Sequence, residues 1–274
     1  SFINPGAGIT TVPAADVGEC CDIAPEIGIS GTPVIDPATN TMYVVVKTKE
    51  VSGGSTNYVQ RLHAIDIATG AEKFGGPVTI NASVPGTGAG SVNGQVPFSA
   101  LHENQHTSMS LINGTLYFGF SSHGDFQPYH GWIFAYNPST LAQKWAVNLT
   151  PNQEGAGVWM SGSGIASDST GNLYFITGDG EFDANTGGKD YGDAYVRMSP
   201  TGAILDYFSP SNTDQINSNN FDLGSGAALL LPDQPGAHPH ELVGAGKDGT
   251  VYLVDRDNMG HFNATTNTNI QTLP

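Results

Sequence analysis

The chain has 274 residues, which is long enough for one large all-β domain or for two smaller domains. It carries 25 acidic and 9 basic residues, giving a formal net charge of −16, and this acidity argues against binding to nucleic acids or to anionic membrane surfaces. The sequence contains no run of 18 apolar residues, so it predicts no membrane span.

Charged residues make up only 12% of the chain, and Ser, Thr, Asn and Gly supply most of its polar character. This composition is common in exported proteins, so we expect an extracellular or periplasmic location. The 36 Gly and 17 Pro residues indicate many turns. No signal peptide is recognisable at the start, which is expected of a mature form or an excised piece.

Residues 28–74 predict the structural unit of the protein. Short runs rich in Val, Ile and Tyr are separated by Asp, Pro, Asn, Thr or Gly, a pattern typical of short strands joined by tight turns. With a further strand after Phe74, they predict one antiparallel sheet of four strands. A sheet with two apolar faces must stack against other sheets, so a chain that repeats the unit should stack the copies.

The sequence repeats this unit three more times. We expect units at about 28–80, 107–150, 161–208 and 224–262, forming a single domain with equivalent tyrosines at 43, 117, 174 and 252. In the second unit, Asn113-Gly114 between two apolar runs is typical of a type I′ hairpin. The longest connections, 82–105, 178–193 and 209–222, have lengths that are usually functional or disordered.

A turn motif closes the first two units. Asp66, Thr69 and Phe74 follow the pattern Asp-x-x-Thr-Gly-x-x-x-Trp with Phe in the last place, and residues 137–145 fit it with Asn137 for Asp and Leu141 for Gly. This resembles the docking motif of the pyrroloquinoline-quinone (PQQ) repeat family of β-propellers. In such a motif, Asp and Thr close a turn through hydrogen bonds to the backbone, and the aromatic ring packs against the next blade.

The resemblance implies an all-β propeller of four-stranded antiparallel blades, with a β-sandwich or a solenoid as the alternative. PQQ-like propellers typically have more than four blades. We therefore expect an incomplete or fragment ring with about four to five blades present, or a ring completed by another chain. Open blade edges would then be available to pair with strands of other protein chains.

The sequence Cys20-Cys21-Asp22 carries a second resemblance. In PQQ-dependent alcohol dehydrogenases, an adjacent Cys pair followed by Asp forms a vicinal disulfide that stacks on one face of the quinone. The resemblance implies that Cys20 and Cys21 bind PQQ. The alternative is a chance pair of thiols or a purely structural clip, because the fold alone does not confer cofactor chemistry.

A candidate calcium loop lies in the third unit. Four oxygen-bearing side chains occur at alternate positions from 179 to 185, and a further aspartate is twelfth counted from the first. This spacing resembles a calcium loop. The residues are Asp179, Glu181, Asp183, Asn185 and Asp190. The loop lacks the central glycine of such a motif, and the alternative is an acidic, solvated loop.

The string His102-Glu103-x-x-His106 matches a zinc-protease motif. On a helix the two histidines would share one face and the glutamate could activate water, which gives a metal-dependent hydrolase as one interpretation. The preceding Pro97 and the strand that follows favour a loop instead, and a loop does not guarantee this geometry.

Two further groups are candidates for ligand binding. His123, Asp125 and His130 lie in one connecting loop, where they could bind a metal or a sugar or could serve turn chemistry. Aromatic residues that could stack on carbohydrate are Phe126, Tyr129, Trp132, Trp145 and Trp159. For Trp145, packing between blades is the better explanation because it ends a docking motif.

Together these observations predict an exported propeller that acts as a binding or assembly module with a calcium site, for a small-molecule or carbohydrate ligand. A quinone- and calcium-dependent dehydrogenase and a metal-dependent hydrolase are the alternatives. The sequence does not decide whether the protein is an enzyme.

Overall fold

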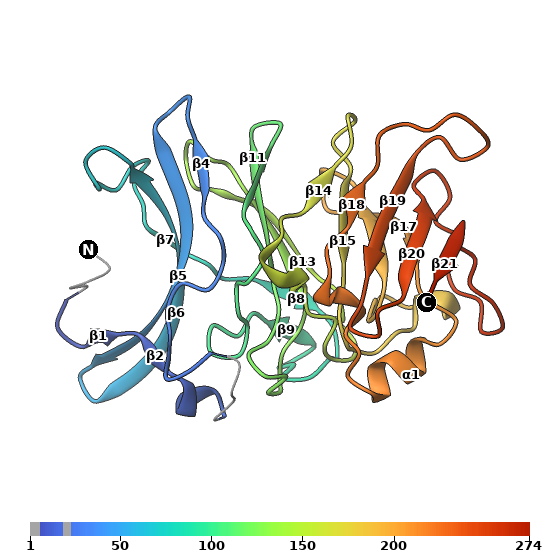
Figure 1. The fold of residues 1–274 in the computed structure, drawn as a ribbon. Helices are drawn as coiled ribbons and strands as arrows, with labels where there is room; N and C mark the ends of the chain where they lie inside the picture. Colours follow the sequence, from blue (N-terminus) through green and yellow to red (C-terminus); the bar gives the residue numbers. More distant parts are fainter. Residues whose placement is uncertain (1–5, 19–22) are drawn as a thin grey trace.

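The structure is a computed structural model that describes residues 6–18 and 23–274. Within them, almost all regular structure is β-strand, and four antiparallel sheets follow one another along the chain (Figure 1). In the second, third and fourth sheets the four strands are adjacent in sequence order. The all-β fold and the four-stranded antiparallel units are therefore confirmed.

The first sheet has a fifth strand, because β1 and β4 pair with different parts of the long strand β5. Its strands are β1 (Ile9–Thr10), β4 (Val34–Asp36), β5 (Thr41–Ser52), β6 (Ser55–Asp66) and β7 (Val78–Thr79). The second sheet contains β10 (Ser110–Ile112), β11 (Thr115–Phe120), β12 (Trp132–Tyr136) and β13 (Gln143–Asn148).

The third sheet consists of β14 (Ala166–Ser167), β15 (Leu173–Ile176), β16 (Tyr195–Met198) and β17 (Ile204–Phe208). The fourth consists of β18 (Leu229–Leu230), β19 (Glu241–Ala245), β20 (Val251–Asp255) and β21 (Gln271–Leu273). Two small hairpins, β2 (Val12–Pro13) with β3 (Glu26–Ile27) and β8 (Ser83–Pro85) with β9 (Gln95–Pro97), lie outside these sheets. The α-helix α1 spans Thr213–Ser218, and no described helix has the length and apolar character needed to cross a bilayer.

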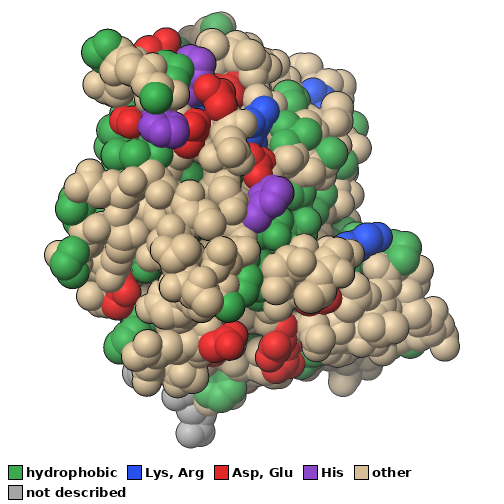
Figure 2. All heavy atoms as spheres, turned by 90° about the vertical axis from the view of Figure 1, so that its right-hand side faces the viewer, with side chains coloured by type: hydrophobic (Ala, Val, Ile, Leu, Met, Phe, Trp, Pro, Cys, Tyr) green, Lys and Arg blue, Asp and Glu red, His purple; other side chains and the backbone are tan. Residues whose placement is uncertain are grey.

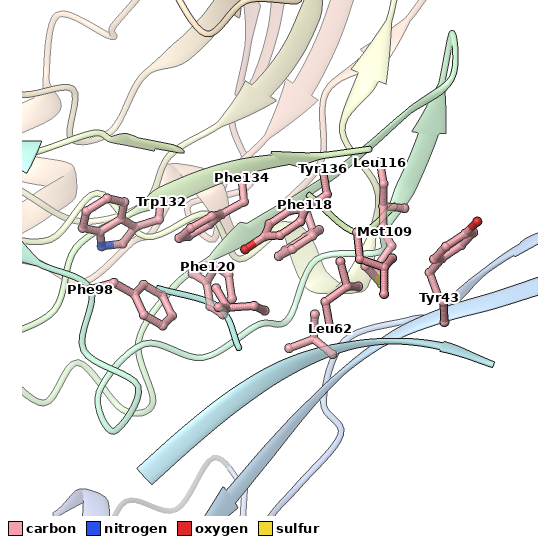
Figure 3. Packing of buried hydrophobic residues seen from close by; sticks show 14 residues of the cluster. Tyr43, Leu62, Phe98, Met109, Leu116, Phe118, Phe120, Trp132, Phe134 and Tyr136 are labelled. Atoms are coloured by element: carbon pink, nitrogen blue, oxygen red, sulfur yellow. The ribbon is translucent and has the colours of Figure 1, made fainter. Parts of the chain in front are cut away.

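The hydrophobic core lies between neighbouring sheets. Alternate residues of a strand point to opposite faces, so Phe118 of β11 packs toward the first sheet while its neighbour Tyr117 packs toward the third. Figure 3 shows the aromatic side chains of β11 and β12 gathered between the first two sheets. Phe134 lies at the centre of this group, with its ring centroid 5.4 Å from those of Phe98 and Phe120.

The sheets form a row in which each contacts the next. Separate core clusters join the first to the second sheet, the second to the third and the third to the fourth. In the described part of the chain no core cluster joins the first sheet to the fourth, and the two lie at opposite ends of the row (Figure 1). This arrangement is propeller-like and agrees with the expected open ring.

The docking motif has the predicted structure. Asp66 Oδ1 accepts hydrogen bonds from the backbone N–H groups of Ala68 and Thr69, at 3.1 and 2.9 Å. The indole of Trp145 in β13 donates from Nε1 to the Pro200 carbonyl of the third sheet at 3.0 Å. The aromatic residue that ends the motif therefore fixes one sheet against the next.

The fourth sheet differs from its expected boundaries. Tyr252 lies in the third strand of its sheet, whereas Tyr43, Tyr117 and Tyr174 lie in β5, β11 and β15 and pair with the strand that follows. The sheet also includes β21, which lies beyond residue 262. Its first strand, β18, has only two residues and gives little sequence signal.

Candidate functional site

A cavity of about 600 Å³ lies where the connections between strands meet. Asp125, Asp179 and Lys247 line it, and each follows the second of the four successive strands in its sheet, β11, β15 or β19. Asp222 and Trp159 enter from the connections between consecutive sheets. The site is therefore built by three sheets together.

Close backbone packing holds these connections in place. A Cβ atom on Gly180 would lie 2.2 Å from the backbone nitrogen of Ala156, so only glycine allows the loop that carries Asp179 to approach this closely. The N–H of Ala156 donates to the Asp179 carbonyl at 2.7 Å. At Asp125, the Ser122 hydroxyl donates to the carboxylate at 2.8 Å, which orients that side chain.

Carboxylates dominate the electrostatics of the cavity. Burial, reinforced by the negative charges of Asp222 and Asp125, raises the pKa of Asp179 to about 7. Asp222 forms an ion pair with Lys247, the cationic residue in the lining. Its backbone N–H also donates to Asp179 Oδ1 at 3.2 Å, which brings the two aspartates together.

A further carboxylate lies behind this lining. Asp193 is fully buried, and its Oδ1 accepts the N–H of Leu223 at 3.2 Å. Its Oδ2 atom is buried without a hydrogen-bond partner in the described structure. Burial and the charge of Asp179 raise the pKa of Asp193 well above its ordinary value. The cavity therefore favours protons or cations at neutral pH.

Aromatic side chains form the other part of the lining. The ring of His106 stacks beneath Trp159 with the two centroids 3.7 Å apart and the planes 29° from parallel. Burial lowers the pKa of His106, so the imidazole is neutral at pH 7. Tyr129 also lines the cavity, and its hydroxyl donates to the Asp179 carbonyl at 3.4 Å. With His106 stacked on one face, the other face of the Trp159 indole can stack against a planar ligand.

The residues of the expected calcium loop are divided between two places. Asp179 faces the cavity, whereas Asp183 and Asp190 lie together, with the Asp190 N–H donating to Asp183 Oδ1 at 2.8 Å. Asn185 lies exposed in a short 3-10 helix, and Glu181 lines a second cavity. Among the described residues, no group of three or more His, Cys, Asp or Glu side chains is arranged to hold a metal. The calcium loop stays a prediction.

The zinc string does not form a metal site. Glu103 is completely buried and accepts a hydrogen bond from Trp132 Nε1 at 3.2 Å, while His106 lies against Trp159. His102 lies instead next to the Ser99 hydroxyl, at 3.1 Å. The segment is not helical, so the histidines do not share a face. The hydrolase interpretation therefore has no support in the described residues.

The histidines near Asp125 hydrogen-bond to neighbouring loops and so have a structural role. His123 Nε2 lies 3.2 Å from the Ile23 carbonyl, and His130 contacts both the Thr150 hydroxyl and the Ala89 carbonyl. Both rings are buried, which agrees with the turn interpretation, and only Asp125 of this group lines the cavity. Cys20 and Cys21 lie outside the described residues.

Sequence reasoning missed the two other charged residues of the cavity, Asp222 and Lys247. Lys247 occupies the position in the fourth sheet that Asp125 and Asp179 occupy in the second and third, shortly after a buried second strand. That shared position was the available signal. The sequence does not show it readily, because the Tyr252 repeat matches the third strand of the fourth unit to the second strands of the other units.

Comparisons with solved structures bear on the fold. No protein-family model matches the chain, and no curated protein matches it. A quinohemoprotein alcohol dehydrogenase, ADHIIG from Pseudomonas putida HK5, superposes with a TM-score of 0.54 at 16% sequence identity. The fold is that of a PQQ-type β-propeller. The match covers 85% of this chain and 41% of the dehydrogenase, so the chain spans less than half of that protein.

A rhamnogalacturonan lyase from Bacillus licheniformis also matches, over 90% of this chain and 52% of the lyase, at 14% identity and a TM-score of 0.33.

Proposed function

We propose that the cavity binds PQQ together with a calcium ion, and that the protein is the cofactor-binding part of a quinone-dependent dehydrogenase. One observation carries this proposal. Carboxylates and a lysine from three successive sheets line one cavity together with the indole of Trp159, which His106 stacks against. The volume of about 600 Å³ suits a cofactor of this size.

The charges of the lining fit a divalent cation. Burial and the charges of Asp222 and Asp125 raise the pKa of Asp179, and a divalent cation between Asp179 and Asp125 would offset the repulsion between their carboxylates. Calcium takes six to eight oxygen ligands, several of which are often waters. Two carboxylates from the chain would leave the other positions to water and to oxygens of the cofactor.

The remaining residues have distinct roles. PQQ carries carboxylates, for which Lys247 supplies a positive charge, and Trp159 supplies an aromatic face for its ring system. The bound quinone supplies the capacity to accept two electrons. Asp222 has a carboxylate at the cavity, paired with Lys247, that can take up a proton from a substrate hydroxyl.

The second candidate is a binding module without redox chemistry, located outside the cell or in the periplasm. The polar lining and the aromatic platform of the same cavity would serve a sugar ligand equally well. Location outside the cytoplasm is a proposal for both functions, because it depends on composition alone.

Reconstitution separates the candidates. Purified protein is titrated with PQQ in the presence of calcium chloride, binding is followed by calorimetry and visible absorbance, and alcohol oxidation is measured with an artificial electron acceptor. We expect Asp179→Asn to weaken calcium-dependent PQQ binding by on the order of tenfold or more. Asp233→Asn is the control, because its side chain is 77% exposed and lies away from the cavity lining.

Binding of PQQ with oxidation of an alcohol supports the dehydrogenase. Binding of a sugar but not of PQQ would favour the binding module. A folded protein that binds neither PQQ nor calcium at millimolar concentrations would overturn the proposal.

A further inference from the structure

A second, smaller cavity of about 190 Å³ borders the first. The two share Asp125, Tyr129, Asp179 and Asn220 in their linings. A ligand in the second cavity would therefore lie beside whatever occupies the first. Its volume is below the roughly 300 Å³ at which pockets for drug-sized ligands begin, so it suits a small molecule.

Two amide side chains line the second cavity in orientations set by the backbone. Gln127 Oε1 accepts the N–H of Tyr129 at 3.0 Å, and Asn217 Oδ1 accepts the N–H of Gly180 at 3.1 Å. Because each amide oxygen accepts a backbone donor, the amide NH₂ group is the end that remains to interact with a ligand. Both residues therefore present hydrogen-bond donors.

Carboxylates line the same cavity and supply acceptors. Glu154 and Glu181 lie on adjacent loops, because the N–H of Glu181 donates to the Glu154 carbonyl at 3.2 Å. None of the described residues in this lining is Lys or Arg. An anionic ligand would therefore meet repulsion, whereas a neutral hydroxyl compound would not.

We propose that the second cavity is the substrate subsite and that it selects small polyhydroxylated alcohols, such as glycerol or a monosaccharide. A hydroxyl group both donates and accepts hydrogen bonds, and this lining offers fixed donors next to carboxylate acceptors. A simple alkyl alcohol would leave these groups without partners on binding, which costs affinity. The inference rests on the proposed function, since it names the substrate of the dehydrogenase.

Glycerol and 1-propanol test this directly, because they share a three-carbon skeleton and differ in two hydroxyl groups. With PQQ and calcium bound, we expect kcat/KM to be at least tenfold higher for glycerol than for 1-propanol. Glycerate, which adds a carboxylate to a similar skeleton, should be oxidised poorly.

The variant Asn217→Asp keeps an oxygen to accept the Gly180 N–H but removes the NH₂ donor. We expect it to lower kcat/KM for glycerol by about tenfold, the value of one hydrogen bond, with little change for 1-propanol. Gln215→Leu is the control, because Gln215 is exposed on the same helix, α1, and lines neither cavity.

The outcomes distinguish the two proposals. Failure to bind PQQ contradicts the proposed function. If PQQ binds and 1-propanol is oxidised as well as glycerol, or if Asn217→Asp changes both substrates equally, only the polyol inference is overturned. If PQQ binds without turnover, saturation-transfer NMR with glycerol decides: contact that weakens in Asn217→Asp supports the inference, and no contact overturns it.

Discussion

At the scale of single residues, Trp159 and His106 form one unit. The imidazole lies against the indole, and its Nδ1 atom is buried without a hydrogen-bond partner in the described structure. The histidine therefore has two interactions, its stacking on Trp159 and a hydrogen bond with the backbone of Ser30. Its sequence neighbourhood had suggested zinc binding, because the sequence shows the spacing of residues but not which face of a chain they occupy.

Replacing His106 with Leu should loosen Trp159. An aromatic pair contributes about 0.5–1.5 kcal/mol beyond its buried area, so we expect easier quenching of tryptophan fluorescence by acrylamide and PQQ binding weaker by about two- to tenfold. His238→Leu serves as the comparison, because the side chain of His238 is 49% exposed and pairs with Asp255 instead. Unchanged quenching and affinity in His106→Leu would contradict a supporting role.

Asp179 makes stability depend on pH. Its pKa is raised from 3.8 to about 7 by burial and neighbouring aspartates, so between these values the folded protein holds a proton that the unfolded chain releases. The free energy of unfolding of the protein without metal should therefore fall as pH rises from about 4 through about 7. Thermal unfolding between pH 4 and 8 measures this.

Asp179→Asn removes one titrating group and should make the fall with pH shallower, while Asp190 and Asp193, whose pKa values are also raised, retain part of it. Calcium, which would bind the ionised carboxylate, should raise the melting temperature more at pH 8 than at pH 5. A wild-type profile that rises steadily over this range, with no effect of calcium at either pH, would refute both expectations.

At the scale of elements, the second sheet was the most predictable from sequence. β11 and β12 are apolar at successive positions, because the sheet is covered on both faces. Asn113-Gly114 marks the hairpin between β10 and β11, and both residues have positive φ. The fourth sheet was less predictable, because β18 has two residues and β21 follows a long stretch rich in Asn and Thr.

Phe134 should be among the most sensitive core positions. It is fully buried between the first two sheets and contacts several other rings. We expect Phe134→Ala to lower the free energy of unfolding by about 3–5 kcal/mol. Val92→Ala, at a side chain that is 62% exposed, should change it by less than about 0.5 kcal/mol. Urea denaturation followed by circular dichroism compares the two, and similar losses would show that the core is not centred there.

At the scale of the whole molecule, the sheets are not equally covered. The second and third sheets are packed on both faces, whereas in the described structure the fourth has a core cluster on one face only. Leu229 and Leu273 at its two edges are 61% and 47% exposed. Figure 2 shows this side of the molecule, where hydrophobic side chains lie among acidic residues and histidines.

The fourth sheet should therefore open more readily than the second. Segments with fewer buried contacts unfold locally at lower free energy, so we expect backbone amides of β19 and β20 to exchange with deuterium faster than those of β11 and β12. Hydrogen exchange followed by mass spectrometry measures this by peptide. Equal protection of the two sheets would show that the uncovered face does not weaken the last sheet.

The architecture could be predicted from sequence because each unit repeats its own strands and turns. The cavity could not, because its residues come from connections of unequal length. Asp125 and Asp179 each follow a second strand, yet the loop after β11 covers only residues 121–131, while the loop after β15 is longer and also holds a 3-10 helix with the exposed Asn185. Only folding brings such positions together with Lys247 and Asp222.

The assembly of the cavity from three sheets has a mechanical consequence. A ligand that contacts Asp125, Asp179 and Lys247 at once would add a further link between sheets that already contact one another through side-chain packing and hydrogen bonds. Its binding free energy would then resist any opening that separates the last sheet from its neighbours. With the ligand bound, the protein should unfold as a single cooperative unit, and the amides of its C-terminal sheet should gain the most protection from hydrogen exchange.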